Sequence, residues 1–232
     1  MSDSVAAMNP DGGAGDRRRL IQPALHVDLM EAVLAPGNMR RAWARVRSNR
    51  GAPGIDGLHI EDFPAFAREQ WPSIRQALSG GTYRPQPVRR VSIPKPGGGE
   101  RLLGIPNVVD RVIQQAIAQV LTPIFDPEFS VSSFGFRPQR SAHGALRQVQ
   151  AYIKARYRIA VDLDLAKFFD NVQHDILMAK VARRIGDKRL LALVGRYLRA
   201  GVMVGDTFQP SEIGTPQGGP LTPRTQKVTL TA

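Results

Sequence analysis

Aspartates stand close together in the segment IAVDLDLAKFFDNVQHDIL, residues 159–177. Apolar residues alternate through its first part, and this period of two predicts a buried strand over residues 159–165. Asp162 and Asp164 then share the opposite face, and Asp170 follows the turn. Carboxylates at a strand end can hold Mg²⁺ together with phosphates and water, and two such ions about 4 Å apart promote phosphoryl transfer. Surface, capping or salt-bridge roles fit the same spacing, so both interpretations stay open.

Two further segments carry groups that could bind a nucleotide. Lys95 and Arg101 flank the glycine triplet Gly97–Gly99, where their cations could contact a triphosphate. The segment GTPQGGP offers backbone N–H groups and one amide side chain, Gln217, and its glycines allow a ligand to approach the backbone closely. Each signal alone is weak, because cations are common at hairpin tips and glycine is common in loops.

The charge of the chain points to a polyanionic partner. Among 232 residues, 32 are Lys or Arg and 20 are Asp or Glu, which gives a net charge of +12. Such a surplus is typical of nucleic-acid or membrane-surface binding, and a merely soluble basic protein is the alternative. The absence of cysteine excludes disulfides and cysteine-ligated metals. No apolar run is long enough to span a membrane, and no signal peptide is present. We therefore expect a soluble cytoplasmic protein that does not bind membranes.

The elements expected around these residues mix helices with strands paired in hairpins, which is an α+β pattern. Val88, Val91 and Ile93 before the glycine triplet, with Leu103 and Ile105 after it, predict a β-hairpin. A second hairpin is expected over residues 201–210, turning at Gly205–Asp206. Helical periodicity predicts the following further elements: a helix capped by Asn38 and ended by Gly51, helices over 62–78 and 108–125, one capped by Ser141, one beginning near Val172, one over 188–200, and one after Thr222 and Pro223.

The first of these helices carries Arg40, Arg41, Arg45 and Arg47 on its polar face. They fit a solvated face and a phosphate-contacting face equally well.

Six segments in order resemble the reverse transcriptases encoded by group II introns, across residues 30–223. They are NRGAPGIDG, YRPQPVRRVSIPKPGGGERLLGIP, DRVIQQAI, FGFRPQRSAHGAL, VDLDLAKFFDNVQHDIL and GTPQGGPLTP. The resemblance implies a right-hand polymerase with fingers and a partial palm. It divides the chain into a disordered tail (1–29), an N-terminal extension and fingers (30–157), a partial palm (158–223) and an aberrant C-terminal tail (224–232).

The resemblance also implies roles for single residues. Asp164 matches the first metal-binding aspartate, with the carbonyl of Leu165 as a further Mg²⁺ ligand. Phe169 matches the ring beneath the incoming sugar, which would exclude a 2′-hydroxyl. Lys95 and Arg101 match the residues that hold the triphosphate, and Gln217 matches the amide beside the nucleotide. The implied partners are template or intron RNA, a DNA primer and deoxynucleoside triphosphates, while Asp162 and Asp170 are not expected to be ligands and His174 is expected to be a structural residue at a helix start.

The chain departs from the family after Pro223. The family continues into an aromatic-Ala-Asp-Asp hairpin, whereas this sequence ends nine residues later and contains no Asp-Asp dipeptide. We therefore expect a truncated fragment that does not polymerise alone. Three interpretations follow: an RNA-directed DNA polymerase fragment, a non-catalytic module that binds intron or template RNA, and a degraded gene product without function.

Overall fold

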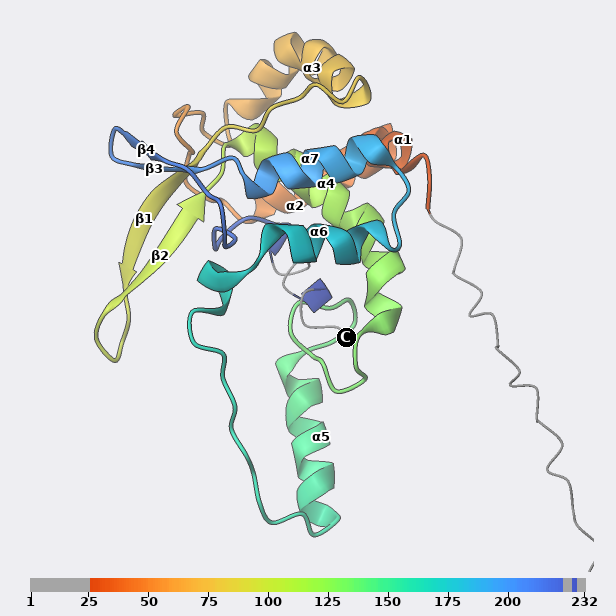
Figure 1. Ribbon diagram of the computed structural model, residues 1–232, viewed down its shortest axis with the longest axis vertical. Coiled ribbons are helices and arrows are strands. Elements are labelled where there is room, and N and C mark those ends of the chain that lie inside the picture. Colours follow the sequence, from red (N-terminus) through yellow and green to blue (C-terminus); the bar gives the residue numbers. More distant parts are fainter. Residues whose placement is uncertain (1–25, 223–226, 229–232) are drawn as a thin grey trace, which may run out of the picture.

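The computed structural model describes residues 26–222 and 227–228, which form a helical body with a sheet on one side (Figure 1). The helices are α1 (Leu29–Leu34), α2 (Pro36–Ser48), α3 (Phe63–Ser79), α4 (Val108–Phe125), α5 (Ala142–Lys154), α6 (His174–Ala182) and α7 (Lys188–Leu198), with short 3₁₀ turns at Asp126–Glu128 and Phe168–Asn171. The strands are β1 (Val88–Pro94), β2 (Glu100–Ile105), β3 (Val202–Val204) and β4 (Thr207–Gln209). The expected α+β class is confirmed.

Helix α4 is the centre of the body. Along the helix predicted over 108–125, apolar residues at helical spacing are buried at Val109, Val112, Ile113, Ile117 and Leu121. They belong to one hydrophobic core with residues of α1, α2, α6 and α7. Burial of this kind is the main favourable term in folding, so α4 gives the other elements a fixed surface to pack on.

The predicted cap of α2 is wrong. The helix begins at Pro36, and Asn38 lies inside it, buried. The Asn38 amide donates to the carbonyl oxygens of Val33 (3.0 Å) and Ala116 (3.1 Å). Proline at the first helical position has a preset φ and lacks an N–H that would be unpaired there. Asn38 therefore ties α1 and α2 to α4 instead of capping a helix.

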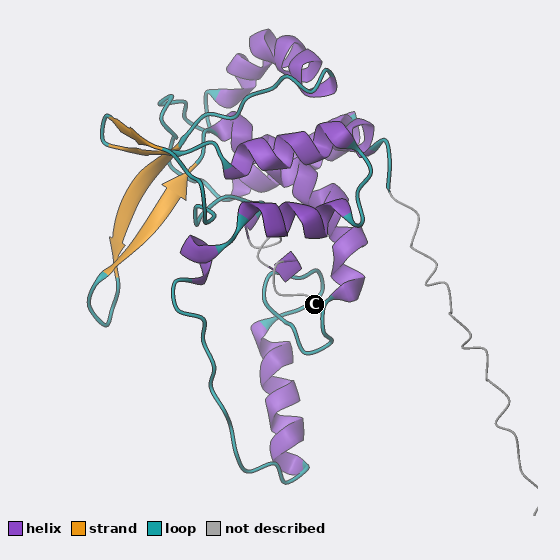
Figure 2. Ribbon diagram, in the orientation of Figure 1, coloured by secondary structure: helices purple, strands orange, loops and turns teal. Residues whose placement is uncertain are grey.

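Both predicted hairpins are present, and they join into one four-stranded sheet in the order β2-β1-β3-β4 (Figure 2). Within each hairpin the strands are antiparallel, and Gly205 and Asp206 separate the paired residues Val204 and Thr207 as expected. The two hairpins meet through a short parallel pairing, with Val88 opposite Val202. This junction was not expected from the sequence, and it fixes the base of the long hairpin to the end of α7.

The predicted buried strand over residues 159–165 is wrong. This segment is an extended loop that leads from the far end of α5 back to the body (Figure 1). The side chains of Ile159, Val161 and Leu163 are 77–88% exposed. A strand needs a neighbour that pairs its backbone and covers its apolar face, and the described residues 26–222 and 227–228 provide none for it.

The two ends of the chain are only partly described. The proposed tail over residues 1–29 lies outside the described residues up to residue 25; His26 pairs with Ile185, and α1 begins at Leu29. At the other end, residues 223–226 and 229–232 lie outside the described part, and so does the helix start expected at Pro223. Lys227 and Val228 are helical, and Val228 is buried in the core.

Candidate functional site

The long hairpin carries Lys95 and Arg101 to its exposed tip. Its turn is closed by hydrogen bonds from Lys95 N to Gly99 O (3.0 Å) and from Gly98 N to Lys95 O (3.1 Å). Gly98 and Gly99 have φ values of +90° and +79°, a backbone region that glycine adopts at little cost. The glycine triplet therefore makes the tight turn predicted for it. Lys95 is exposed, and Arg101 pairs across the ladder with Ile93.

Arg101 contacts Gln217, a residue 116 positions away in the sequence. The Nε–H of Arg101 donates to Oε1 of Gln217 (2.9 Å), and Gly104 N donates to the carbonyl oxygen of Gln217 (2.7 Å). The glycine-rich loop thus lies along the outer edge of β2. Two of the residues singled out from the sequence are in direct contact.

Two glycines make this contact possible. A Cβ atom on Gly104 would lie 2.6 Å from Val88 Cγ2 and 2.8 Å from Pro216 Cβ. A Cβ on Gly218, whose φ is +121°, would lie 2.8 Å from the carbonyl oxygen of Gly104. All three distances are too short for a real Cβ atom, so the loop docks on β2 only because neither glycine has a side chain.

The other side of the same loop is joined to the segment FFDN. Thr215 N donates to Phe169 O (2.8 Å), and Gly214 N donates to Val172 O (2.8 Å). The buried ring of His174, which begins α6 as predicted, donates from Nε2 to Gly214 O (2.6 Å); this partner requires the proton on Nε2. The loop therefore bridges the hairpin and the residues that follow the aspartate-bearing segment.

A cleft of about 340 Å³ lies between one face of the sheet and this loop. Gln217 and Asp170 both line it, together with Arg90, whose guanidinium donates to Oε1 of Gln209 (3.2 Å). The remaining lining residues are Leu102, Leu103, Gly104, Val202, Pro210, Ser211, Ile213, Gly214, Thr215 and Pro216. The lining thus combines one cation (Arg90), two amide side chains (Gln209 and Gln217) and one carboxylate (Asp170) with apolar residues.

The other residues singled out lie outside this cleft. Asp162 and Asp164 are exposed on the extended segment, where Asp164 Oδ1 accepts from the neighbouring N–H of Leu165 (2.9 Å). The Phe169 ring is half-buried and packs edge-on against Phe168, with ring centres 6.0 Å apart. Lys95 and Asp164 are not brought together with Gln217.

The donor atoms around Asp164 suit magnesium only in part. A carboxylate and the Leu165 carbonyl oxygen are ligand types that Mg²⁺ accepts. In the part of the chain that the structure describes, however, there is no cluster of three or more His, Cys, Asp or Glu side chains that could hold a metal ion. Asp164 and the Leu165 carbonyl could therefore supply part of the ligand set of a magnesium site, and further oxygen ligands would be needed.

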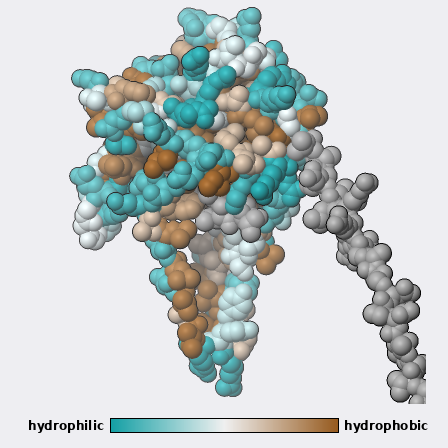
Figure 3. Space-filling model, viewed as in Figure 1, coloured by the Kyte–Doolittle hydropathy of each residue, from teal (hydrophilic) through white to brown (hydrophobic). Residues whose placement is uncertain are grey.

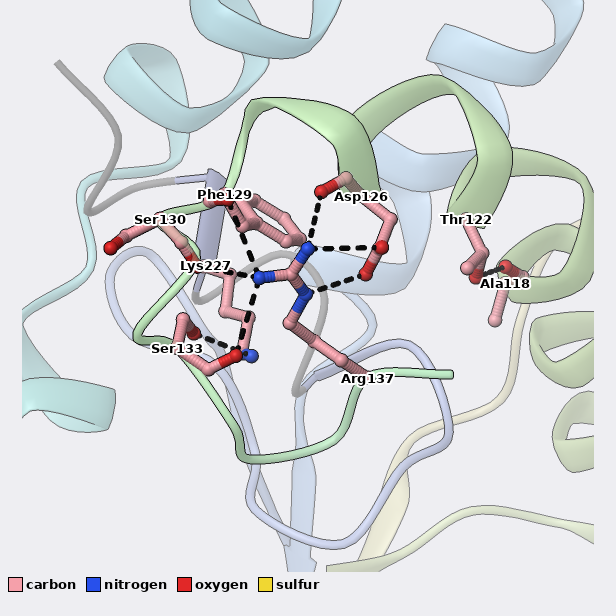
Figure 4. A network of polar contacts seen from close by, with 8 residues as sticks. All are labelled: Ala118, Thr122, Asp126, Phe129, Ser130, Ser133, Arg137 and Lys227. Atoms are coloured by element: carbon pink, nitrogen blue, oxygen red, sulfur yellow. Dashed lines mark hydrogen bonds and ion pairs between the residues drawn. The ribbon is translucent and has the colours of Figure 1, made fainter. Parts of the chain in front are cut away.

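Sequence reasoning missed Arg137, which organises the loop before α5 (Figure 4). Its guanidinium pairs with both carboxylate oxygens of Asp126 (2.9 and 3.1 Å) and donates to the carbonyl oxygens of Phe129, Ser130 and Ser133. These hydrogen bonds hold the pKa of the Asp126 carboxyl below its usual value. An arginine in the aromatic segment FGFRPQ was a visible signal, but its partners were not.

Sequence reasoning also missed a buried carboxylate, Asp110, in the first turn of α4. The hydroxyls of Tyr83 and Tyr197 both donate to its Oδ1, at 2.8 and 3.0 Å. Burial raises the pKa of Asp110 to about 6, although these hydrogen bonds act in the opposite direction. The sequence signal was an aspartate within an otherwise apolar helical stripe.

No helix among the described residues is long and apolar enough to cross a membrane.

Comparison with known proteins identifies the family. Residues 93–231 match the family model described as reverse transcriptase (RNA-dependent DNA polymerase). Protein YkfC of Escherichia coli is 35% identical over 215 residues, which cover 90% of this chain and 56% of YkfC. The group II intron-encoded protein LtrA of Lactococcus lactis is 36% identical over 196 residues, covering 84% of this chain and 32% of LtrA. The chain thus spans between about a third and just over half of these relatives' lengths.

A solved structure confirms the fold. The chain described as part of a partial Cas6-RT-Cas1–Cas2 complex superposes with a TM-score of 0.59 at 24% identity, over 87% of this chain and 34% of that one. The predicted class, fingers with part of a palm from a right-hand polymerase, is therefore confirmed. This chain belongs to the reverse transcriptase (RNA-dependent DNA polymerase) family, and group II intron-encoded proteins are among its relatives.

Proposed function

We propose that this chain carries the nucleotide-binding part of an RNA-directed DNA polymerase of the group II intron type. The reaction is template-directed nucleotidyl transfer. The 3′-hydroxyl of a DNA primer loses its proton to solvent and attacks the α-phosphorus of a deoxynucleoside triphosphate, a phosphodiester bond forms, and the bond to pyrophosphate breaks. The observation that supports this best is the contact of Arg101 with Gln217 at the edge of the cleft.

Arg101 is suited to bind a triphosphate. Its Nε–H is paired with a neutral amide, so its positive charge is not compensated by that contact. Hydrogen bonds between charged groups are about twice as strong as neutral ones, so a phosphate oxygen can compete with Gln217 for the guanidinium. Lys95 at the hairpin tip would supply a second cation, and Gln217, once released, could contact the nucleotide.

The remaining roles follow the family resemblance. Phe169 would lie beneath the sugar and exclude a 2′-hydroxyl. Asp164 and the carbonyl of Leu165 would hold Mg²⁺, which when bound activates the attacking hydroxyl and stabilises the leaving pyrophosphate. The proposed partners are template or intron RNA, a DNA primer and deoxynucleoside triphosphates. The division into fingers (30–157) and partial palm (158–223), and the cytoplasmic location, stay predictions.

We propose further that these 232 residues by themselves bind substrates without polymerising them. They contain no Asp-Asp dipeptide, and Asp164 alone cannot position two metal ions. Loss of a metal-binding carboxylate removes several kcal/mol of transition-state stabilisation, roughly a thousandfold in rate. The alternative function, a non-catalytic RNA-binding module, is favoured by the net charge of +12.

The experiment measures binding and extension with the same purified chain. We expect a fluorescent deoxynucleoside triphosphate to bind, and Arg101→Ala to weaken its binding roughly tenfold, the loss of about 1.4 kcal/mol. Arg75→Ala on α3, which is exposed and does not line the cleft, should leave the affinity unchanged. With an RNA template, a DNA primer and Mg²⁺, we expect no extended product.

Two results would contradict these proposals. Template-dependent product that Asp164→Ala abolishes would show that the chain is active alone. Equal affinity of the wild type and Arg101→Ala for the nucleotide would remove Arg101 from the proposed site.

A further inference from the structure

Residues 80–87 form a strap that connects α3 to β1. Its first half, Gly80 to Tyr83, is hydrogen-bonded to the end of α3, whereas its second half offers few backbone donors. Pro85 and Pro87 have no backbone N–H, and Gln86 lies between them. The strap must carry the chain from the helical body to the base of the hairpin whose tip bears Lys95 and Arg101. The pairing of Val88 with Val202 already joins the base of the hairpin to the chain after α7, and the fastening of the strap adds a second attachment.

The fastening is provided by Asp110. Its carboxylate is 1% exposed, and Oδ1 accepts from the hydroxyl of Tyr83, which belongs to the strap (2.8 Å). Its Oδ2 accepts from the backbone N–H of Gln86 at 3.4 Å, the longest contact of the group. One buried side chain of α4 thus holds the strap at two points on either side of Pro85.

Helix α7 completes the attachment from the other side. The buried hydroxyl of Tyr197 donates to the same Oδ1 of Asp110 (3.0 Å), and Arg196 Nη1 donates to the carbonyl oxygen of Tyr83 (3.2 Å). Just beyond the strap, Val88 N donates to Gly201 O (3.1 Å), where the chain leaves α7. The strap, α4 and α7 therefore meet at the Asp110 carboxylate, and the strap enters β1 two residues after Gln86.

We propose that Asp110, Tyr83 and Tyr197 form a buried clamp that sets the orientation of the β1–β2 hairpin and so positions Arg101 for the incoming triphosphate. Asp110 acts through Arg101 and is a positioning residue. Burying a carboxylate costs free energy unless it is hydrogen-bonded. An apolar residue at this position would fill the core without that cost, so packing alone does not explain the carboxylate. The clamp deepens the proposed nucleotide-binding function and rests on it.

The test uses the absence of cysteine in the native sequence. Spin labels at Gly97→Cys, on the hairpin tip, and Ala44→Cys, exposed on α2, report the distance between hairpin and body. Tyr83→Phe combined with Tyr197→Phe removes both hydroxyls with almost no change in volume. We expect a narrow distance distribution in the native background and a broadened or shifted one in the double variant, together with a severalfold loss of nucleotide affinity that disappears when Arg101 is already Ala.

The control is Leu177→Ala on α6, which creates a cavity in the hydrophobic core because the Leu177 side chain is fully buried. It should lower the melting temperature and leave the label distance unchanged. The proposal is overturned if the double variant keeps the native distance distribution, or if Leu177→Ala broadens that distribution equally. The distance is measured without nucleotide; failure of every variant to bind nucleotide would therefore contradict the proposed function and leave the distance result standing.

Discussion

At the scale of single residues, the sequence identified Arg101 and Gln217 but not their contact. The motif around each residue is local, whereas the contact depends on Gly104 and Gly218 allowing a loop to lie against β2. Asp110 is a second residue whose partners could not be predicted. Its helical position was predictable, but its function as an acceptor for two tyrosines from other elements was not, because no local pattern encodes pairs so distant in the chain.

Asp110 predicts a pH dependence of stability. Its pKa is raised from 3.8 to about 6 in the folded chain, so between these values the folded state binds more protons than the unfolded state. Its contribution to the free energy of unfolding is therefore fully present below pH 3.8 and is lost as the pH rises through 6. The change amounts to roughly 3 kcal/mol. Urea denaturation of wild type and Asp110→Asn from pH 4 to 7.5 measures it.

Other carboxyls, such as Asp126, have lowered pKa values and change stability in the opposite direction. The difference between wild type and Asp110→Asn isolates Asp110 from them. We expect that difference to become less favourable to the wild type as the pH rises. A difference that stays constant with pH would contradict the raised pKa.

At the scale of elements, periodicity predicted well those elements whose partners lie nearby in the described structure. The stripe of α4, the cap of α5 by Ser141 and both hairpin turns are confirmed, since each depends on local spacing or on a neighbour close in sequence. The segment 159–165 failed because alternation encodes a strand's faces and not the neighbour that must cover them. Apolar side chains gather along this segment on the surface of the lower projection (Figure 3).

The exposed segment gives a test that separates the two interpretations of residues 159–165. Replacing Ile159, Val161 and Leu163 by serine should change the free energy of unfolding by less than about 0.5 kcal/mol, as for other surface substitutions, and should reduce aggregation. Chemical denaturation and light scattering measure the two effects. Ile113→Ser in the core of α4 is the control and should cost several kcal/mol. A comparable loss of free energy of unfolding in the triple variant would support the buried strand and contradict the exposed loop.

At the scale of the whole molecule, the net charge was predictable from the sequence, whereas the positions of the charged side chains on the surface were not. The structure places Arg40, Arg41, Arg45 and Arg47 on the exposed side of α2. None of them forms an ion pair with a carboxylate among the residues that the structure describes, whereas Arg137 and Arg189 do. The hypothesis of a phosphate-contacting face, which the sequence left equal to that of a solvated face, therefore gains support from this uncompensated charge.

Binding to RNA at several salt concentrations decides between these two hypotheses. Each phosphate contact with a single strand contributes about 0.7 to the slope of log affinity against log salt. If α2 contacts phosphates, Arg45→Gln combined with Arg47→Gln should reduce that slope by about 1.4 and weaken binding to all sequences alike. Arg68→Gln with Arg75→Gln, the same charge change on the exposed side of α3, is the matched control. An equal reduction by both pairs would mean that α2 contributes only to the overall charge, and no salt dependence in the wild type would contradict RNA binding by this chain.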